Sequence, residues 1–464
     1  MQRETFVLPE ADGTVLPPTW LDGLAIQRAA AERRAAQLII PKRRVLLRAL
    51  PIGARSVGIG IAALTGGAQA AAPRMRKLCE RQGPTYLKLG QVVSGGAGLF
   101  PQPMIDAFSD FRDALPPETW DHVERVITEE IPGGVGRFAS IDRVPLAAAS
   151  IAQVHAATLP DGREVVIKVQ RPRVSDQVET DLTLLATTAH FVDRFIPAAR
   201  TANLPGIVNY LAETVVQELD FRLEAENMLD VGAALSHGTS AGGVVAPRPH
   251  HDLVTRRVLV MERMHGIPSG DAAAVRAAGV DIEALLRSGF MSFLEGAMVH
   301  GVFHGDLHPG NVIVLADGRY GILDFGIVGR IDKVGRMAFT RLLEAGFRDD
   351  HRGQLEAMRD LGAFPADANL DDLERDIDRD AIPVGSKLPN MQAVATTIRA
   401  NLRMMMRHHF RLPTLLVLLS KNLLFANDTL QRYAPDMDLL GDAGPFIMQS
   451  LMAMNEEDDA PEPG

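Results

Sequence analysis

The chain has 464 residues, a length that allows two or three domains. Its 46% hydrophobic and 23% charged residues exclude a wholly disordered chain. The formal charge of −10 argues against a protein devoted to nucleic acid, because such proteins carry a basic surface. Cys79 is the single cysteine, so no disulfide can form within the chain and we expect a reducing, cytoplasmic location.

Residues 1–72 are expected to form a basic N-terminal arm followed by a linker. Residues 28–55 contain eight arginine and lysine residues and one acidic residue, Glu32, with leucines and isoleucines between them. Such a segment can lie on an anionic membrane surface, and the alternative is a solvated helix packed on its own domain. Residues 56–72 are uncharged and rich in glycine and alanine, too short and too weakly apolar to span a membrane. They favour either a flexible linker or a tightly packed helix.

The rest of the chain divides into four blocks. Residues 73–140 have helical periodicity, and residues 141–265 turn to strand patterns. Within the second block, residues 151–158 and 164–169 flank an Asp-Gly turn and predict a β-hairpin. Helical patterns dominate residues 266–450, and the acidic, proline-containing residues 451–464 are expected to be disordered. A small strand-rich lobe before a larger helical lobe predicts an α+β, two-lobed fold with a helical N-terminal extension.

The strongest chemical signal lies in the helical lobe. Asp306 and Asn311 have the H-x-D-x-x-x-x-N spacing of a phosphoryl-transfer loop, and Asp324 opens a D-F-G triplet. Asn311 and Asp324 offer hard oxygen ligands for magnesium, which neutralises phosphate charge. Asp306 can orient or deprotonate an attacking hydroxyl. His304 is interpreted as a structural histidine of the loop, because no cysteine or third histidine nearby would complete a zinc site.

An upstream lysine fits the same chemistry. Lys168 ends the sequence Val-Val-Ile-Lys, which is typical of the strand lysine that contacts nucleotide phosphates and pairs with a helical carboxylate. Glu224 is the preferred partner and Glu218 the second choice, although the sequence does not decide between them. The loop before this strand lacks the usual glycines and reads Ala147-Ala148-Ala149-Ser150. Because alanine restricts φ, this Ala-rich loop should hold phosphate in a geometry of its own.

Taken together, these motifs resemble the UbiB/AarF family of atypical, protein-kinase-like proteins, whose eukaryotic members support coenzyme Q synthesis. The resemblance rests on the K-x-G-Q motif Lys88–Gln91, the Ala-rich loop, residues 166–172 around Lys168, the E-x-D motif Glu218–Asp220, the loop His304–Asn311, and Asp324–Gly326. It extends over most of the chain, from about residue 83 to residue 329 and more loosely to residue 433.

The resemblance implies further roles. The K-x-G-Q helix would cover the place where a peptide binds in a protein kinase, with Lys88 and Gln91 meeting Glu218 and Asp220 near the nucleotide. The backbone around Glu262 and Met264 would hold adenine. The cofactors implied are ATP and magnesium, and the implied partner is a lipid or isoprenoid-type molecule.

Three functions are compatible with these residues. The first is an ATPase or small-molecule or lipid kinase that supports isoprenoid-lipid or quinone metabolism at a membrane surface. The second is a conventional phosphotransferase for proteins or small molecules, against which the K-x-G-Q motif and the Ala-rich loop speak. The third is a non-enzymatic, nucleotide-gated lipid-binding scaffold. The phosphoryl acceptor is not readable from the sequence.

Overall fold

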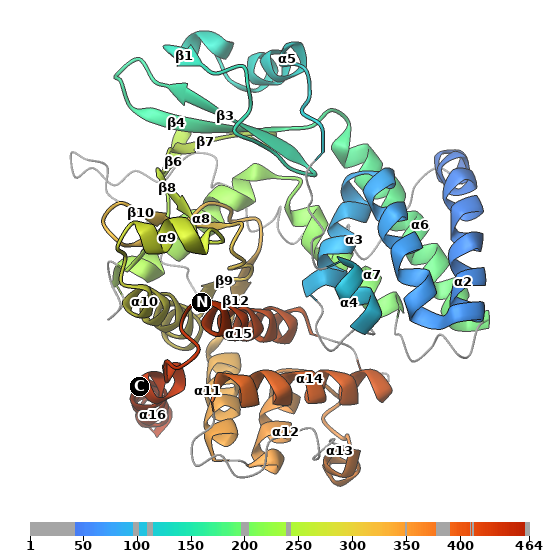
Figure 1. Ribbon diagram of the computed structural model, residues 1–464, viewed down its shortest axis with the longest axis vertical. Coiled ribbons are helices and arrows are strands. Elements are labelled where there is room, and N and C mark those ends of the chain that lie inside the picture. Colours follow the sequence, from blue (N-terminus) through green and yellow to red (C-terminus); the bar gives the residue numbers. More distant parts are fainter. Residues whose placement is uncertain are drawn as a thin grey trace, which may run out of the picture. The chain divides into compact units, whose positions relative to one another are not determined.

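The computed structural model describes residues 42–95, 102–108, 115–195, 204–237, 243–348, 350–376, 390–408, 410 and 413–459. The chain divides into two compact units (Figure 1). Unit 1 comprises residues 1–229 and 247–263, and unit 2 comprises residues 230–246 and 264–464. The boundary after Arg263 falls two residues before the end of the strand-rich lobe expected from the sequence.

A six-stranded antiparallel sheet forms one part of unit 1. Its order is β1-β3-β4-β7-β6, with β2 paired to β3. The strands are β1 (Ser140–Ile141), β2 (Ala147–Ala148), β3 (Ala152–Thr158), β4 (Glu164–Gln170), β6 (Pro249–Val254) and β7 (Val258–Glu262). The predicted hairpin is confirmed as β3 and β4, and its turn uses Gly162 at φ 88°.

Alternation along β4 gives the two faces of this sheet different roles. Val165, Ile167 and Val169 point to one face and pack in a core with helix α5 (Trp120–Glu130), which lies over the sheet in Figure 1. The 3₁₀ segment Gly134–Arg137 follows α5. Because side chains alternate along a strand, Lys168 points to the opposite face.

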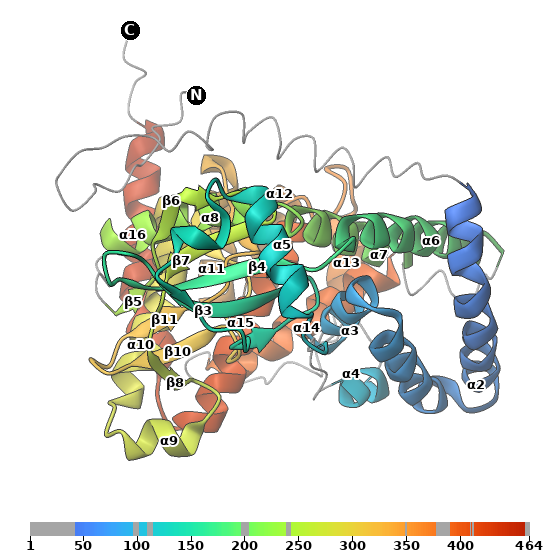
Figure 2. The ribbon, with the colours of Figure 1, turned by 90° about the horizontal axis from the view of Figure 1, so that it is seen from above.

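Helices form the other part of unit 1. They are α2 (Lys42–Gln82), α3 (Pro84–Gly95), α4 (Gln102–Phe108), α6 (Val174–Phe195), α7 (Leu204–Gln217) and the first turns of α8 (Phe221–His237). Helices α6 and α7 run side by side in both views (Figure 2). Cys79 and Tyr86 are buried in the common core with Val178 and Leu211.

The stretch expected as a linker or a packed helix is helical. Residues 56–72 continue α2, and the helix is interrupted at Gly67, with φ 62° and ψ −158°. A left-handed φ of this kind favours glycine, because a side chain there would clash with the backbone. The arm residues 1–41, including Arg28, lie outside the described residues.

Unit 2 is mainly helical. Its helices are α9 (Ala272–Ala277), α10 (Ile282–Glu295), a π-helical segment (Gly296–His300), α11 (Lys333–Phe347), α12 (His351–Asp360), α13 (Leu370–Asp376), α14 (Met391–Arg407), α15 (Thr414–Tyr433) and α16 (Leu439–Asp459). Aspartates cap α9, α10, α11 and α12, each accepting a hydrogen bond from a first-turn amide. Phe293, Phe303 and Phe339 lie in its core.

Two small sheets complete unit 2. One has the order β5-β11-β10-β8, and the other pairs β12 with β9. The strands are β5 (Val244–Val245), β8 (Gly266–Pro268), β9 (Val302–His304), β10 (Val312–Leu315), β11 (Tyr320–Ile322) and β12 (Val328–Arg330). These short strands hold the loop His304–Asn311 between β9 and β10.

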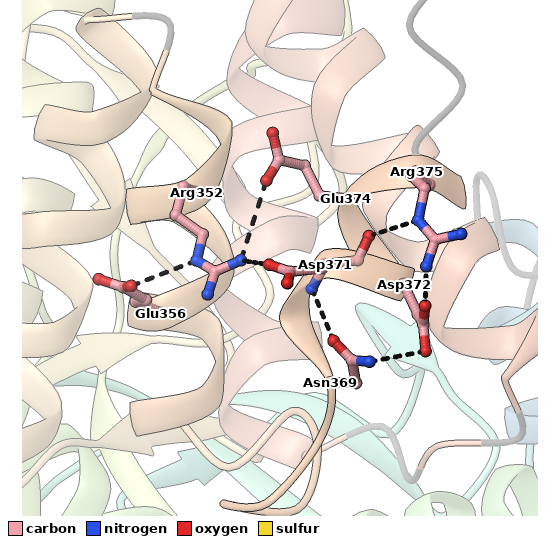
Figure 3. Close-up of polar contacts among 7 residues, drawn as sticks. All are labelled: Arg352, Glu356, Asn369, Asp371, Asp372, Glu374 and Arg375. Carbon is pink, nitrogen blue, oxygen red and sulfur yellow. Dashed lines mark hydrogen bonds and ion pairs between the residues drawn. The ribbon is translucent and has the colours of Figure 1, made fainter.

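Polar contacts at the surface join α12 to α13. Arg352 pairs with Glu356 on its own helix and with Asp371 on α13, while Asn369 Nδ2 donates to Asp372 Oδ2 over 2.9 Å (Figure 3). Because these groups are exposed, their pairs contribute little to stability. The cluster is therefore interpreted as a solvated connection between two helices.

Helix α16 reaches into the acidic tail. It ends at Asp459, so residues 451–459 of the tail expected to be disordered are helical, and residues 460–464 lie outside the described residues. None of the helices in the described part of the chain has the length and hydrophobicity that crossing a membrane requires.

Candidate active site

The loop between β9 and β10 is held by a buried histidine. His304 is 4% exposed, its Nδ1 accepts from the amide of Asp306 over 3.0 Å, and its Nε2 lies 2.5 Å from the carbonyl of Asp324. Since Nδ1 accepts, Nε2 carries the proton and donates. Burial lowers the pKa of His304, which keeps the ring neutral. His304 therefore links Asp324 to the loop that carries Asp306.

Asn311 and Asp324 lie next to each other because a hairpin joins them. Strands β10 and β11 pair over Val312–Val314 and Tyr320–Ile322, and the amide of Leu323 donates to the carbonyl of Asn311 over 2.8 Å. The Asn311 amide Nδ2 donates to the Asp306 carbonyl over 3.2 Å. That contact uses the side-chain nitrogen and leaves the oxygen as the group suited to a metal.

This donor set fits magnesium. Among the described residues, no group of three or more histidine, cysteine, aspartate or glutamate side chains could form a metal cage. Magnesium in nucleotide sites is commonly held by one or two protein oxygens together with phosphates and water. The amide of Asn311 and the carboxylate of Asp324, on neighbouring backbone segments, match that pattern.

A lysine far along the chain contacts the candidate catalytic aspartate. Lys421 Nζ on α15 lies 2.7 Å from Asp306 Oδ1, with both side chains largely buried, at 17% and 15% exposure. The ammonium also lies 5.4 Å from the centre of the Phe425 ring. Sequence reasoning missed Lys421, because no motif marks its position in the sequence. The separation along the chain offered no local signal for this contact.

Unit 1 contains the predicted lysine and its carboxylate partner. Lys168 Nζ donates to Glu224 Oε1 over 2.6 Å, with the side chains 15% and 3% exposed. The lysine also lies 5.4 Å from the ring centre of Phe221, one turn before Glu224 on α8. The structure therefore pairs Lys168 with the carboxylate preferred from the sequence, and Glu218 has a different partner.

The K-x-G-Q helix contacts one member of the E-x-D motif. Lys88 Nζ on α3 lies 2.7 Å from Glu218 Oε1, with both side chains mostly buried. Asp220 instead forms a two-pronged contact with Arg222, whose Nε and Nη2 donate over 2.9 and 2.7 Å. The resemblance placed Asp220 beside Lys88 and Gln91, and the structure assigns its carboxylate to Arg222. The reason is local, since Asp220 also accepts from the backbone amide of Arg222 at the start of α8.

The Ala-rich loop forms a short strand and a turn. Ala147 and Ala148 form β2 against β3, and the amide of Ala149 donates to the carbonyl of Ala152 over 2.8 Å. Ser150 follows in this turn and is 1% exposed. Ala147 and Ala148 therefore belong to the sheet, and Ala149 begins the turn that leads into β3.

The buried side chain of Arg171 forms hydrogen bonds that hold this turn. Its guanidinium is 7% exposed and donates to the carbonyls of Ala149 and Pro116 over 2.9 and 3.0 Å and to Glu118 Oε1 over 2.8 Å. A planar group with five donors can satisfy several carbonyls at once, which lysine cannot. Sequence reasoning included Arg171 in a motif without assigning it a role.

The residues expected near adenine lie at the end of β7. The amide of Glu262 donates to the carbonyl of Arg248 over 2.9 Å, so it takes part in the sheet. Met264 forms no backbone hydrogen bond with the described residues.

Comparison with known proteins gives a consistent picture. A model of the ABC1 atypical kinase-like domain matches residues 110–358. An uncharacterized protein of Mycobacterium tuberculosis is 36% identical over 78% of this chain and 74% of its own length. A probable protein kinase UbiB of Erwinia tasmaniensis is 32% identical over 81% of this chain and 69% of its own length.

A plant relative and a solved structure extend the comparison. An uncharacterized aarF domain-containing protein kinase of Arabidopsis thaliana is 33% identical over 66% of this chain and 57% of its own length. The complex of Rv3197 with erythromycin from Mycobacterium tuberculosis covers 83% of this chain and 100% of its own, at 23% identity and a TM-score of 0.43. The expected UbiB/AarF resemblance and the kinase-like α+β fold are confirmed by the domain match and the named relatives.

Proposed function

Because the chain belongs to the ABC1 atypical kinase-like family, we propose that it binds ATP with magnesium and transfers the terminal phosphoryl group to a hydroxyl acceptor or to water. The observation that carries this proposal is the geometry of unit 2. A neutral buried histidine and a hairpin there bring Asp306, Asn311 and Asp324 onto adjoining backbone segments. Phosphoryl transfer depends on such positioning, since it is catalysed mainly by placement and electrostatics.

The residues of unit 2 would divide the work. Asn311 and Asp324 would hold magnesium, whose charge offsets that of the phosphates. Asp306 would orient the acceptor hydroxyl and receive its proton. Lys421, paired with Asp306, would keep that carboxylate in place and add positive charge beside it. These roles follow from Asp306 and Asn311 on one loop and from Asp324, which the β10–β11 hairpin brings to the neighbouring segment.

The residues of unit 1, with the adjoining Met264 at which unit 2 resumes, would bind the nucleotide. Lys168, positioned by Glu224, would contact the phosphates, and the turn of Ala147–Ser150 would cover them. The backbone of Met264, next to Glu262, would bond to adenine. The contact between Lys88 and Glu218 would fix the K-x-G-Q helix in the same unit.

The acceptor class is inferred from the family and the N-terminal arm. The resemblance to UbiB/AarF proteins favours isoprenoid-lipid or quinone metabolism. The basic segment of residues 28–55 suits an anionic membrane surface, because clustered arginines and lysines are attracted to acidic lipids. We therefore place the reaction at a membrane surface, with a lipid-like acceptor or activator.

Phosphate release from magnesium-ATP tests the proposal. The full chain is assayed with neutral and anionic vesicles, beside Asp306→Asn and the matched control Asp317→Asn, which changes an exposed carboxylate in the β10–β11 turn. We expect release that anionic vesicles stimulate, that Asp306→Asn loses by at least about a hundredfold and that Asp317→Asn retains. Nucleotide binding without any release would instead favour the scaffold function, or a kinase whose acceptor is absent from the assay.

A further inference from the structure

An apolar cavity that is partly open to solvent lies in unit 2, beside the loop that carries Asp306. Its volume is about 130 Å³, and its wall comes from α10, β10, β11, α15 and the later turns of α8. Phe290 and Phe293 line one side, and Val312, Val314 and Leu430 line others. His304 and Leu307 form the part of the wall next to the loop.

The size suits one small ring. An engineered protein cavity of about 150 Å³ lined by leucine, isoleucine and phenylalanine stays dry and binds benzene. The cavity in unit 2 has a similar lining and a slightly smaller volume. Well-packed cores contain few voids of this size, so the cavity is a candidate binding site.

One polar atom on the wall lacks a partner. Asn422 on α15 is 4% exposed, and its Nδ2 donates to the carbonyls of His304 and Leu418 over 2.9 and 3.1 Å. Its Oδ1 is buried and has no hydrogen-bond partner among the described residues. A buried acceptor without a partner is costly, and a donor on a ligand would satisfy it.

Two other polar residues on the wall, Tyr433 and His304, already have partners. The Tyr433 hydroxyl donates to the carbonyl of Ser269. Both ring nitrogens of His304 are used, one by the amide of Asp306 and the other by the carbonyl of Asp324. Among the described residues, Asn422 Oδ1 is therefore the buried side-chain acceptor on this wall that lacks a partner.

We propose that this cavity binds a ring-sized apolar molecule that carries one hydrogen-bond donor, and that Asn422 Oδ1 accepts from it. Binding would also reach the catalytic loop, since the same amide holds the carbonyl of His304, whose ring holds Asp306 and Asp324. This second part rests on the proposed function, whereas the binding site itself does not.

Indole and indene test the binding site, because they share a shape and differ in one N–H donor. Binding to the full chain is measured by calorimetry without nucleotide. We expect indole to bind about three- to tenfold more tightly than indene, the range that one hydrogen bond provides. Equal affinities would refute the role of Asn422, and no binding of either would refute the site.

A substitution that fills the cavity provides a second test of the binding site. Ala426 lines the cavity one turn after Asn422, so Ala426→Leu should abolish binding of both probes. Gln431→Leu adds a leucine on an exposed position of the same helix outside the cavity and should leave binding unchanged. Probe binding retained in Ala426→Leu would place the probes elsewhere and overturn the proposal. Should Ala426→Leu fail to fold, the comparison of the two probes on the unmodified chain still decides.

Phosphate release separates this inference from the proposed function. If indole binds and the chain hydrolyses ATP, we expect indole to change the rate more than indene does. If indole binds and no hydrolysis occurs under any condition, the cavity site stands and the proposed activity fails. If hydrolysis occurs and is indifferent to bound indole, the coupling through Asn422 is wrong.

Discussion

At the scale of single residues, the contact between Lys168 and Glu224 serves both folding and the proposed activity. Both groups are largely buried and lie 2.6 Å apart. Removing one member of a buried ion pair costs about 3–5 kcal/mol, because the remaining charge loses its partner. We expect Lys168→Met to lower the free energy of unfolding by about 3 kcal/mol and to abolish ATP turnover, as measured by urea unfolding and phosphate release.

A double variant separates the two effects. Replacing Glu224 as well removes the carboxylate that Lys168→Met leaves behind, so Lys168→Met/Glu224→Met should recover most of the stability. Turnover should stay absent, because no lysine reaches the phosphates. Turnover that returned with stability would show that Lys168 has only a structural role.

Lys421 is a second residue whose role can be isolated. Its ammonium lies 2.7 Å from Asp306, so Lys421→Met should release that carboxylate and lower kcat about ten- to a hundredfold with little change in KM for ATP. The control is Lys77→Met, an exposed lysine on α2. An unchanged kcat in Lys421→Met would mean that Asp306 keeps its position without the ion pair.

At the scale of elements, the Ala-rich turn depends on a buried guanidinium. Arg171 donates to Ala149 and Pro116 and pairs with Glu118, so Arg171→Leu leaves these acceptors without donors. We expect a loss of about 2–4 kcal/mol of stability, faster amide exchange at Ala149 and weaker ATP binding. Hydrogen exchange by mass spectrometry measures the turn directly. Arg163→Leu, at the exposed β3–β4 turn, is the control, and equal exchange in both variants would contradict this role.

The elements also show what the sequence could predict. The Asp-Gly turn and the two strands beside it followed from local patterns, as did the spacing that joins Asp306 to Asn311. Contacts between distant segments could not be predicted in this way. Asn422 reaches His304 across 118 positions, and Lys421 reaches Asp306 from the same helix. Such contacts depend on how the helix packs, which no short motif encodes.

Close choices between similar residues likewise needed the fold. Glu218 and Glu224 are both carboxylates near the start of α8, and only packing assigns the first to Lys88 and the second to Lys168. The Ala-rich segment was expected to be an unusual loop. It forms a short strand and a turn instead, because its backbone forms hydrogen bonds with the backbone of β3.

At the scale of the whole molecule, each unit contains a buried neutral histidine. In unit 1, His155 Nδ1 donates to the carbonyl of Asp142 and its Nε2 accepts from Gln153, each over 2.8 Å. In unit 2, His304 is held as described above. Burial lowers the pKa of both rings below the ordinary value for histidine. Each ring therefore takes up its proton at a lower pH in the folded chain than in the unfolded chain, which accepts it near pH 6.5.

Stability should consequently fall as the pH drops below about 6.5, because the unfolded state then binds more protons than the folded state. Below that pH, each buried histidine contributes a slope of up to about 1.4 kcal/mol per pH unit to the free energy of unfolding. Above it, the histidine contributes no pH dependence. Urea unfolding between pH 7.5 and 5.5 measures the slope, which His155→Asn should reduce. The exposed His190→Asn on α6 should not change it. A slope that His155→Asn leaves intact would show that other groups govern acid unfolding, among them His250, whose pKa burial also lowers.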